Sequence, residues 1–451
     1  MHSLFNLRHI LLMTTAGAVL LSAADAALAG GFAIREQSAS SQGASFAGNA
    51  AGGDLSSMFW NPAAVVVRPG LNNESHYSYI MGSSDWTAQP GTAAPLLALG
   101  TQSGDIGQNA LVGSDYFNYQ LSPKLFLGVS LNAPFGLSTK AEGLWAGSPQ
   151  ATTSKLTSYN LTPTVGYVVA PGLSIGVGLQ IEDMHAILKS SPFVLTKLGA
   201  AAFTNPVVND ASDIGIGFTA GVLWQPHAAT TIGVGFRSSV SHSLEGTAFI
   251  DGTTPPGGPL AGSSAAIRAD LDTPEVVTLS LRQKLSPQFT GLLTGEWTNW
   301  SRLNSLNIVC RTVGTNALNP GCPAVGSSLQ NLALNWHDGW FIAGGLEYQH
   351  APNLILRTGI AWEQSPIQNP TERLLSLPDS DRFWVSVGAT YKYNEANSFD
   401  FAYSHVFFDD ASIDRSFQGL RLLANSSADA DIVSVSWKSK LDLSAIAAPL
   451  K

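Results

Sequence analysis

From about residue 70 onward, apolar side chains alternate with small or polar ones. Segment 232–237 reads Ile-Gly-Val-Gly-Phe-Arg, and segment 354–363 has the same period of two. This period is typical of β-strands whose two faces meet different surroundings. Fourteen segments have this pattern and are long enough to cross a membrane as strands. They lie at residues 70–81, 110–121, 125–135, 154–169, 173–188, 212–224, 230–245, 269–285, 289–302, 333–349, 354–363, 381–393, 397–408 and 429–441.

The connections between these segments alternate strictly between short and long. The short ones lie at 122–124, 170–172, 225–229, 286–288, 350–353 and 394–397. The long ones lie at 82–109, 136–153, 189–211, 246–268, 303–332, 364–380 and 409–428. Bacterial outer-membrane barrels have short periplasmic turns and long external loops. We therefore predict an all-β membrane protein, with an antiparallel barrel of about fourteen strands over residues 69–441 and a periplasmic tail at 442–451.

Composition favours a barrel over the other kinds of membrane protein. Only 12% of the 451 residues are charged, and 44 are glycine. A spanning helix needs about 20 consecutive apolar residues, and no such run follows residue 30. Since only helices and closed barrels satisfy all backbone groups in a bilayer, a barrel remains. The net charge of −9 argues against nucleic acid as a partner.

The first 29 residues predict a secretory signal peptide. Arg8 precedes the apolar stretch 10–24, and Ala27-Leu28-Ala29 matches the small-x-small cleavage pattern. The alternative is a membrane anchor, for which the apolar stretch is short. We expect the mature chain to begin at Gly30 and to reside in the bacterial outer membrane.

Residues 30–68 break the alternating pattern. This segment is rich in Gly, Ser and Ala, and it contains the apolar stretch 58–67. Fourteen strands enclose a lumen wider than the wall side chains fill, so the segment is predicted to plug that lumen. The alternative is a disordered periplasmic tail, against which the apolar stretch argues.

Strand parity also places charged side chains of both signs inside the barrel. Their balance predicts salt bridges that brace the wall and the plug, with a contact to a ligand carboxylate as the alternative for one or two cations. The predicted set is Arg237, Arg282, Arg357, Arg382, Lys392, Glu182, Glu296, Glu347, Glu363 and Asp400.

Aromatic residues near strand ends, among them Tyr79, Trp224, Trp300 and Trp362, predict girdles at the membrane interfaces, with ordinary core packing as the alternative.

Little in the sequence points to chemistry. Cys310 and Cys322 lie in one long loop and can form a disulfide in an oxidising compartment. Two thiols without further ligands fall short of a zinc site, so no metal is expected. Nucleophile-elbow, zinc-protease and phosphate-loop motifs are missing, and no cofactor is expected. We therefore do not expect an enzyme, although a Ser–His–Asp site on a barrel is an alternative.

Several motifs, taken in order, resemble those of the FadL family. That family comprises outer-membrane transporters for long-chain fatty acids and other hydrophobic compounds, including aromatic hydrocarbons. The resemblance covers nearly the whole mature chain. The matching segments are Gly31-Phe32, 38–43, 47–48, Asn61-Pro62-Ala63, 132–137, 297–300, 336–340, 357–361, 378–384 and 405–410.

The resemblance implies a plugged barrel that takes up hydrophobic small molecules by passive transport. External loops would capture the substrate, and a pocket beside the plug, or hatch, would bind it. Phe32 matches the family's hatch residue in that pocket, and Asn61-Pro62-Ala63 matches the hatch signature. Substrate would leave sideways through an inward kink of the third strand, at Asn132, Pro134, Phe135 and Gly136. We expect a monomer in contact with outer-membrane lipid and lipopolysaccharide.

Two departures from the family pattern bear on function. Fatty-acid transporters place a basic residue in the fifth strand, where this chain reads Glu182-Asp183-Met184-His185. This favours neutral or aromatic substrates. The chain also runs past Trp437 to Lys451, instead of ending in an aromatic residue. The alternative function is that of an adhesin or structural barrel that acts through its long external loops.

Overall fold

A computed structural model gives the fold of most of the chain. It describes residues 30–191, 193–196, 199–202, 207–250, 264–315, 321–417 and 419–441. The predicted signal peptide and the predicted tail at 442–451 lie outside the described residues.

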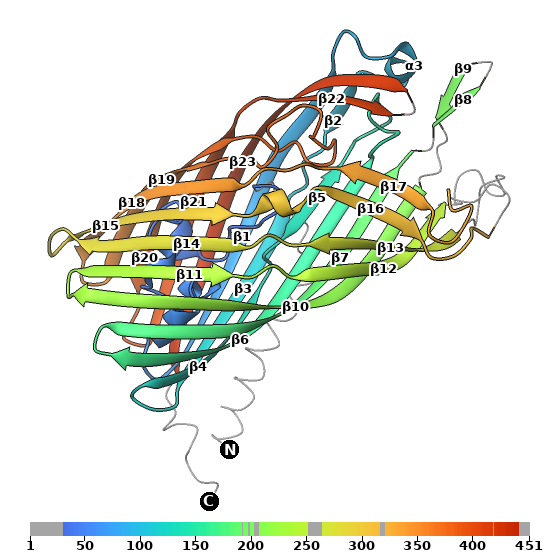
Figure 1. Cartoon of the computed structure of the whole chain (residues 1–451). Coiled ribbons are helices and arrows are strands. Elements are labelled where there is room, and N and C mark those ends of the chain that lie inside the picture. The colour runs from blue at the N-terminus through green and yellow to red at the C-terminus, as the bar shows by residue number, and fades with distance from the viewer. Residues whose placement is uncertain are drawn as a thin grey trace, which may run out of the picture.

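The described strands form a closed antiparallel barrel (Figure 1). Twenty-one strand segments belong to one sheet, and pairing of Leu71 with Leu441 begins the ladder that joins the first strand to the last. The segments are β1 (Leu71–Ala88), β2 (Gln102–Asp105), β3 (Ala110–Gln120), β4 (Leu125–Asn132), β5 (Gly136–Lys140), β6 (Thr153–Ala170), β7 (Leu173–Ser190), β10 (Val207–His227), β11 (Thr230–Arg237), β12 (Ser241–Ile250), β13 (Ser264–Asp272), β14 (Val276–Lys284), β15 (Phe289–Thr298), β16 (Ser305–Cys310), β17 (Ser328–Ala333), β18 (Gly339–Ala351), β19 (Leu354–Glu363), β20 (Arg382–Lys392), β21 (Asn397–Phe408), β22 (Ala411–Phe417) and β23 (Leu420–Leu441). A separate pair, β8 (Phe193–Thr196) and β9 (Gly199–Ala202), lies outside this sheet.

The prediction of fourteen wall strands is confirmed. Seven wall strands are interrupted by a short irregular segment, so each counts as two segments of the sheet. These are β2–β3, β4–β5, β11–β12, β13–β14, β15–β16, β17–β18 and β21–β22. The short turns predicted at 122–124, 170–172 and 286–288 each join two adjacent wall strands.

The two faces of the wall follow the predicted parity. On β20, Phe383, Val385 and Val387 are exposed on the outside, whereas Arg382 and Ser386 are buried inside. Lys392, predicted to face the lumen, is instead exposed where β20 ends.

Parts of the predicted long loops are strands. β1 continues to Ala88 and β23 begins at Leu420, within the predicted loops 82–109 and 409–428. These extensions pair with each other, as in the match of Ala88 with Ala424. They lack clear alternation in the sequence, because only membrane lipid imposes an apolar outer face.

The N-terminal segment, residues 30–68, lies inside the barrel. It contains the short helices α2 (Ala39–Gln42), η2 (Asn49–Ala51), η3 (Leu55–Phe59) and η4 (Pro62–Val66). Most of its side chains are buried, and Ala50 and Ala63 have no exposed surface. Two further short helices, α3 (Ala94–Leu97) and η5 (Trp300–Arg302), lie in connections. None of the helices among the described residues has the length and apolar character needed to cross a membrane.

Glycines in the wall allow the N-terminal segment to pack directly on the strands. A Cβ atom added to Gly235 would overlap the carbonyl oxygen of Trp60, and one added to Gly233 would overlap that of Ala50. The sequence indicated that these were strand glycines. Because these glycines lack side chains, the backbones of the wall strand and of the N-terminal segment can approach each other closely.

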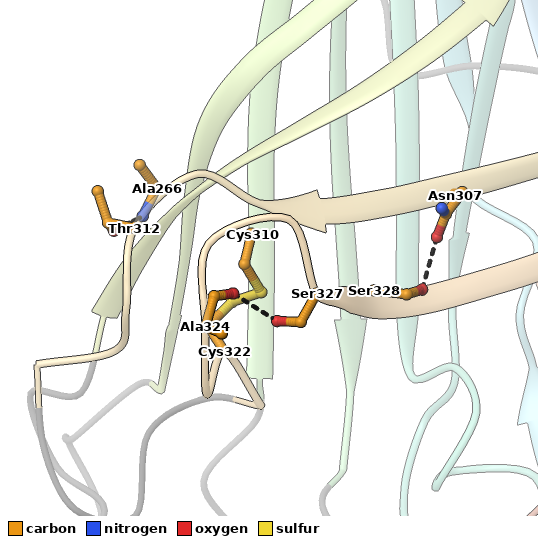
Figure 2. The surroundings of a disulfide bond; sticks show 8 residues. All are labelled: Ala266, Asn307, Cys310, Thr312, Cys322, Ala324, Ser327 and Ser328. Atoms are coloured by element: carbon orange, nitrogen blue, oxygen red, sulfur yellow. Dashed lines mark hydrogen bonds between the residues drawn. A yellow bond between two sulfur atoms is a disulfide. The ribbon is translucent and has the colours of Figure 1, made fainter.

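Cys310 and Cys322 form a disulfide, as the sequence allowed (Figure 2). The bond joins the end of β16 to the connection that leads into β17, and both cysteines are fully buried. This external hairpin is attached to the wall through β13, where Ile267 pairs with Cys310.

Candidate ligand pocket

An apolar cavity of about 60 Å³ lies between the N-terminal segment and the wall. Aromatic rings, two prolines and two arginines surround it. Its lining includes Ile34, Arg35, Phe59, Trp60, Pro134, Phe135, Arg237, Pro274, Val276, Glu296, Trp300, Trp340, Phe341 and Glu363. Concave sites with apolar walls and a few polar groups are typical of small-molecule binding.

Four aromatic side chains form a cluster beside this cavity. The Phe32 ring centroid lies 5.6 Å from that of Phe135, 4.9 Å from that of Trp300 and 5.8 Å from that of Trp336. The prediction that Trp300 belongs to an interface girdle is wrong, since this residue is buried inside. Trp300 follows the end of β15, where the chain leaves the wall, and strand parity no longer holds there.

The N-terminal segment fills the interruption between β4 and β5. The N–H of Ile34 donates to the carbonyl oxygen of Pro134 at 2.8 Å, and the N–H of Gly136 donates to that of Phe32 at 2.8 Å. The amide of Gln37 donates to the carbonyl oxygen of Ala133 at 2.8 Å. Asn132, 0% exposed, donates to the hydroxyl of Tyr116 at 2.8 Å. The interruption thus coincides with the third-strand residues that the resemblance identified, and it borders the cavity.

Arg35, which the sequence did not single out, is the ionic centre of the cavity wall. Its guanidinium lies 2.7 Å from the Glu296 carboxylate and 2.9 Å from that of Glu363. It also stacks over the Phe341 ring at 3.8 Å. Arg35 therefore ties the N-terminal segment to two wall strands. Strand parity predicted that the two glutamates face the lumen. It could not predict that their partner lies in the N-terminal segment.

Arg237, the other arginine of the cavity, has only neutral partners among the described residues. Its guanidinium donates to the side-chain oxygen of Gln180 and, at 3.4 Å, to the carbonyl oxygen of Phe59. It lies over the Phe59 ring at 4.4 Å from the centroid. The side chain is buried, so this cation has given up water without gaining a direct carboxylate partner.

Four of the remaining predicted lumen charges, Arg282, Arg357, Glu347 and Asp400, pair with one another away from the cavity. Arg357 lies 2.8 Å from Glu347 and 3.8 Å from Asp400, and Arg282 lies 2.5 Å from Glu347. Arg382 pairs with Asp379. The ion pairs of Glu347 join strands of the wall, and their bracing role stays a prediction. Within the described part of the chain, no group of three or more His, Cys, Asp and Glu side chains could hold a metal ion.

Asn61-Pro62-Ala63 does not line the cavity. The amide of Asn61 donates to the carbonyl oxygens of Ala50 at 2.8 Å and Val222 at 2.9 Å, and its oxygen accepts from the N–H of Ala63 at 3.0 Å. This motif therefore begins η4 and attaches the N-terminal segment to β10.

Comparisons with known sequences extend over nearly the whole chain. Residues 20–440 match the family model described as outer membrane protein transport protein (OMPP1/FadL/TodX). Outer membrane protein P1 of Haemophilus influenzae is 27% identical over 435 residues, which is 86% of this chain and 88% of that protein. The long-chain fatty acid transport protein of Escherichia coli K12 is 24% identical over 410 residues, covering 83% of this chain and 87% of that protein.

Solved structures share the architecture at lower sequence identity. A FadL homologue from Pseudomonas aeruginosa superimposes with a TM-score of 0.78 at 20% identity, covering 91% of this chain and all of that one. The toluene transporter TodX from Pseudomonas putida gives 0.67 at 14% identity, covering 89% and 97%. The family match therefore agrees with the architecture, a fourteen-stranded barrel with its N-terminal segment inside. This chain is a member of the OMPP1/FadL/TodX family of outer-membrane transport proteins.

Proposed function

We propose that this protein takes up hydrophobic small molecules through its cavity and releases them sideways at the interruption between β4 and β5. One observation carries the proposal. The apolar cavity is bounded on one side by Ile34 and Arg35 of the N-terminal segment and on the other by Pro134 and Phe135 of the interrupted strand. A molecule bound there therefore lies next to both the N-terminal segment and the interruption in the wall.

The N-terminal segment acts as a hatch in this proposal. Its backbone lies against the wall glycines, and its polar groups bond to the wall, as when the N–H of Gly48 donates to the Thr294 hydroxyl at 2.8 Å. A filled lumen holds back water and polar solutes. The route for a hydrophobic molecule is then apolar, as its chemistry requires.

We propose a molecule with a hydrophobic body and a carboxylate as the preferred substrate. Arg237 supports this, because it borders an apolar cavity and has no carboxylate partner among the described residues. A charge-assisted bond to a ligand carboxylate would satisfy it. Residues 182–185 of the fifth strand, β7, include no Arg or Lys, as the sequence indicated, but β11 supplies Arg237. Neutral aromatic hydrocarbons are the second candidate, favoured by the four-ring cluster around Phe32.

Binding of matched ligands by purified protein distinguishes these substrates. We expect oleate to bind more tightly than oleyl alcohol, and Arg237→Gln to weaken oleate binding by about 10-fold or more, because a bond to a charged group contributes roughly 1.5–3 kcal/mol. Arg237→Lys should retain part of the affinity. Lys284→Gln, at an exposed position on the neighbouring β14, is the control. If Arg237→Gln lost affinity for oleate and oleyl alcohol equally, the result would argue against a contact with the carboxylate.

Uptake by cells tests the proposal as a whole. A deletion strain should lose uptake of radiolabelled oleate or toluene, and unchanged uptake of both would contradict it. The protein acts in this proposal as a monomer surrounded by outer-membrane lipid and lipopolysaccharide, and no catalytic step is involved.

A further inference from the structure

The barrel wall has a second break, between β10 and the strand formed by β11 and β12. Along one edge, β10 pairs with β7 without a gap from Val207 to Trp224. Along the other edge, β10 pairs with β12 from Val207 to Ser212 and with β11 from Thr219 onward. Residues 213–218 have no register partner in β11 or β12, although the N–H of Ser238 donates to the carbonyl oxygen of Phe218 at 2.9 Å.

At this break, the chain between β11 and β12 folds inward across β10. The amide of Gln180 donates to the carbonyl oxygen of Ser238 at 3.3 Å, and the Glu182 carboxylate lies 3.3 Å from the imidazole of His242. Gln180 and Glu182 belong to β7, which is two wall strands away. Residues 238–242 therefore lie on the lumen side of β10 and not beside it.

Two glycines of β10 make room for this inward fold. A Cβ atom on Gly217 would lie 2.8 Å from a methyl carbon of Val240, and one on Gly215 would overlap the other methyl. Val240 is 1% exposed and covers the unpaired part of β10 from within. It is thus the inner seal of the break.

The outer side of the same break faces the lipid. Ile214 and Ile216 are 66% and 68% exposed, more than lipid-facing Val385 in an intact part of the wall at 39%. An unpaired backbone edge is tolerated at membrane depth only where it is buried in protein or lines a water-filled cavity. Residues 238–242 bury this edge, so the wall would open here if they moved aside.

Among the described residues, several buried polar atoms around the break have no hydrogen-bond partner. They include the hydroxyls of Thr219, Ser239 and Ser243, and Thr219 is only 2% exposed. Buried polar groups are nearly always bonded, so groups like these call for an additional partner, such as water or the polar end of a ligand.

The ligand cavity borders the first break directly, and one of its lining residues lies next to the second. Arg237 lines the cavity and immediately precedes Ser238, where the inward fold begins, whereas Pro134 lines the cavity at the first break. We propose that the break between β10 and β12 is a second lateral exit, sealed by Val240, for ligands with a hydrophobic body and a polar head. Gln180, Ser238 and His242 provide its polar lining. This inference rests on the proposed function, because it needs a ligand in the cavity.

Photolabelling with a diazirine-bearing fatty acid tests the second exit directly. Full-length protein in lipid vesicles is irradiated with this probe, and the labelled residues are mapped by mass spectrometry. We expect label on residues 213–218 and 238–243, together with label on 132–136. Label at 132–136 alone would overturn the second exit while supporting the proposed function, whereas no displaceable label at either break would count against both.

A variant of the seal gives a second, independent measurement. Val240→Ala should increase the rate of fatty-acid release into vesicles by severalfold, with the affinity of the cavity little changed. Val234→Ala, at a lipid-facing position in the intact β11 ladder, is the matched control. Heat-modified migration in gels checks that both variants are folded. Equal release by Val240→Ala, the control and the unmodified protein would overturn the role of Val240.

Discussion

The N–H of Ile34 donates a 2.8 Å hydrogen bond to the carbonyl oxygen of Pro134. Residue 33 also forms an isolated antiparallel bridge with Phe135. The N-terminal segment thus takes the place of a ladder partner where the wall strand is interrupted. Because the backbone groups at the interruption are satisfied by a separable segment, the wall can open there if that segment moves.

Gln37 provides a side-chain link between the N-terminal segment and the first break. It donates to the carbonyl oxygens of Ala133 at 2.8 Å and Ile34 at 3.1 Å, and it accepts from Asn132 at 3.2 Å. Gln37→Ala leaves buried partners unsatisfied, at about 1–3 kcal/mol for each group. We expect hydrogen exchange of residues 31–37 to accelerate at least 10-fold, with the barrel strands unchanged.

Gln42→Ala is the matched control for this prediction. Gln42 is equally buried but bonds to Ile432 and Ser434 of β23, away from the break. Similar acceleration of residues 31–37 in both variants would show that Gln37 has no special role at the break.

The wall could be predicted from the sequence because lipid imposes its pattern directly. On β11, the exposed Val234 alternates with Gly233 and Gly235, which face the N-terminal segment. In such a strand an apolar residue faces lipid, so the alternation alone is enough to assign each side chain to the outside or the inside of the barrel. The external parts of β1 and β23 escaped prediction because no lipid constrains their outer face.

The pocket was less predictable, because it forms where strand parity fails. Trp300 lies just beyond the end of β15, and Trp336 lies between β17 and β18. Arg35 belongs to the N-terminal segment, and its pairing with Glu296 joins residues far apart in the chain. Such contacts depend on how irregular segments meet in three dimensions, and no periodic pattern records them.

Glu36 should make docking of the N-terminal segment depend on pH. Glu36 is buried, and burial raises the pKa of its carboxyl to about 7. Nearby backbone N–H groups lower the pKa in part, Glu363 raises it further, and Arg35 lowers it. A raised carboxyl pKa stabilises the docked segment fully below the ordinary value of 4.5, and this contribution is lost as the pH rises through about 7.

We therefore expect hydrogen exchange of residues 31–40 to be faster at pH 8 than at pH 5, after correction for the intrinsic pH dependence of exchange. Glu36→Gln should remove this difference, because the amide remains neutral throughout. Glu142→Gln, at an exposed position, should leave it unchanged. A pH difference that persists in Glu36→Gln would assign the effect to another group.

The disulfide should stabilise the external hairpin without affecting the barrel. Cys310 and Cys322 are 12 positions apart, and closing a loop of this size contributes roughly 3 kcal/mol. We expect the double variant Cys310→Ser, Cys322→Ser to be cleaved by protease within 305–333 at least 10-fold faster. The heat-modified migration of the barrel should stay the same, since β14, β15 and β18 pair independently of this hairpin. A lower unfolding temperature of the barrel would contradict this separation.

Displacing the N-terminal segment should turn the barrel into an open pore. In Gly235→Val, the new side chain would overlap the backbone of Trp60, so the segment cannot dock as it does now. We expect large, nonspecific conductance in planar bilayers, as for deletion of residues 30–68. Gly295→Val is the control, because a Cβ atom there meets nothing within 4 Å. If Gly235→Val inserts as a folded barrel and conducts no more than the control, the N-terminal segment is not what closes the lumen.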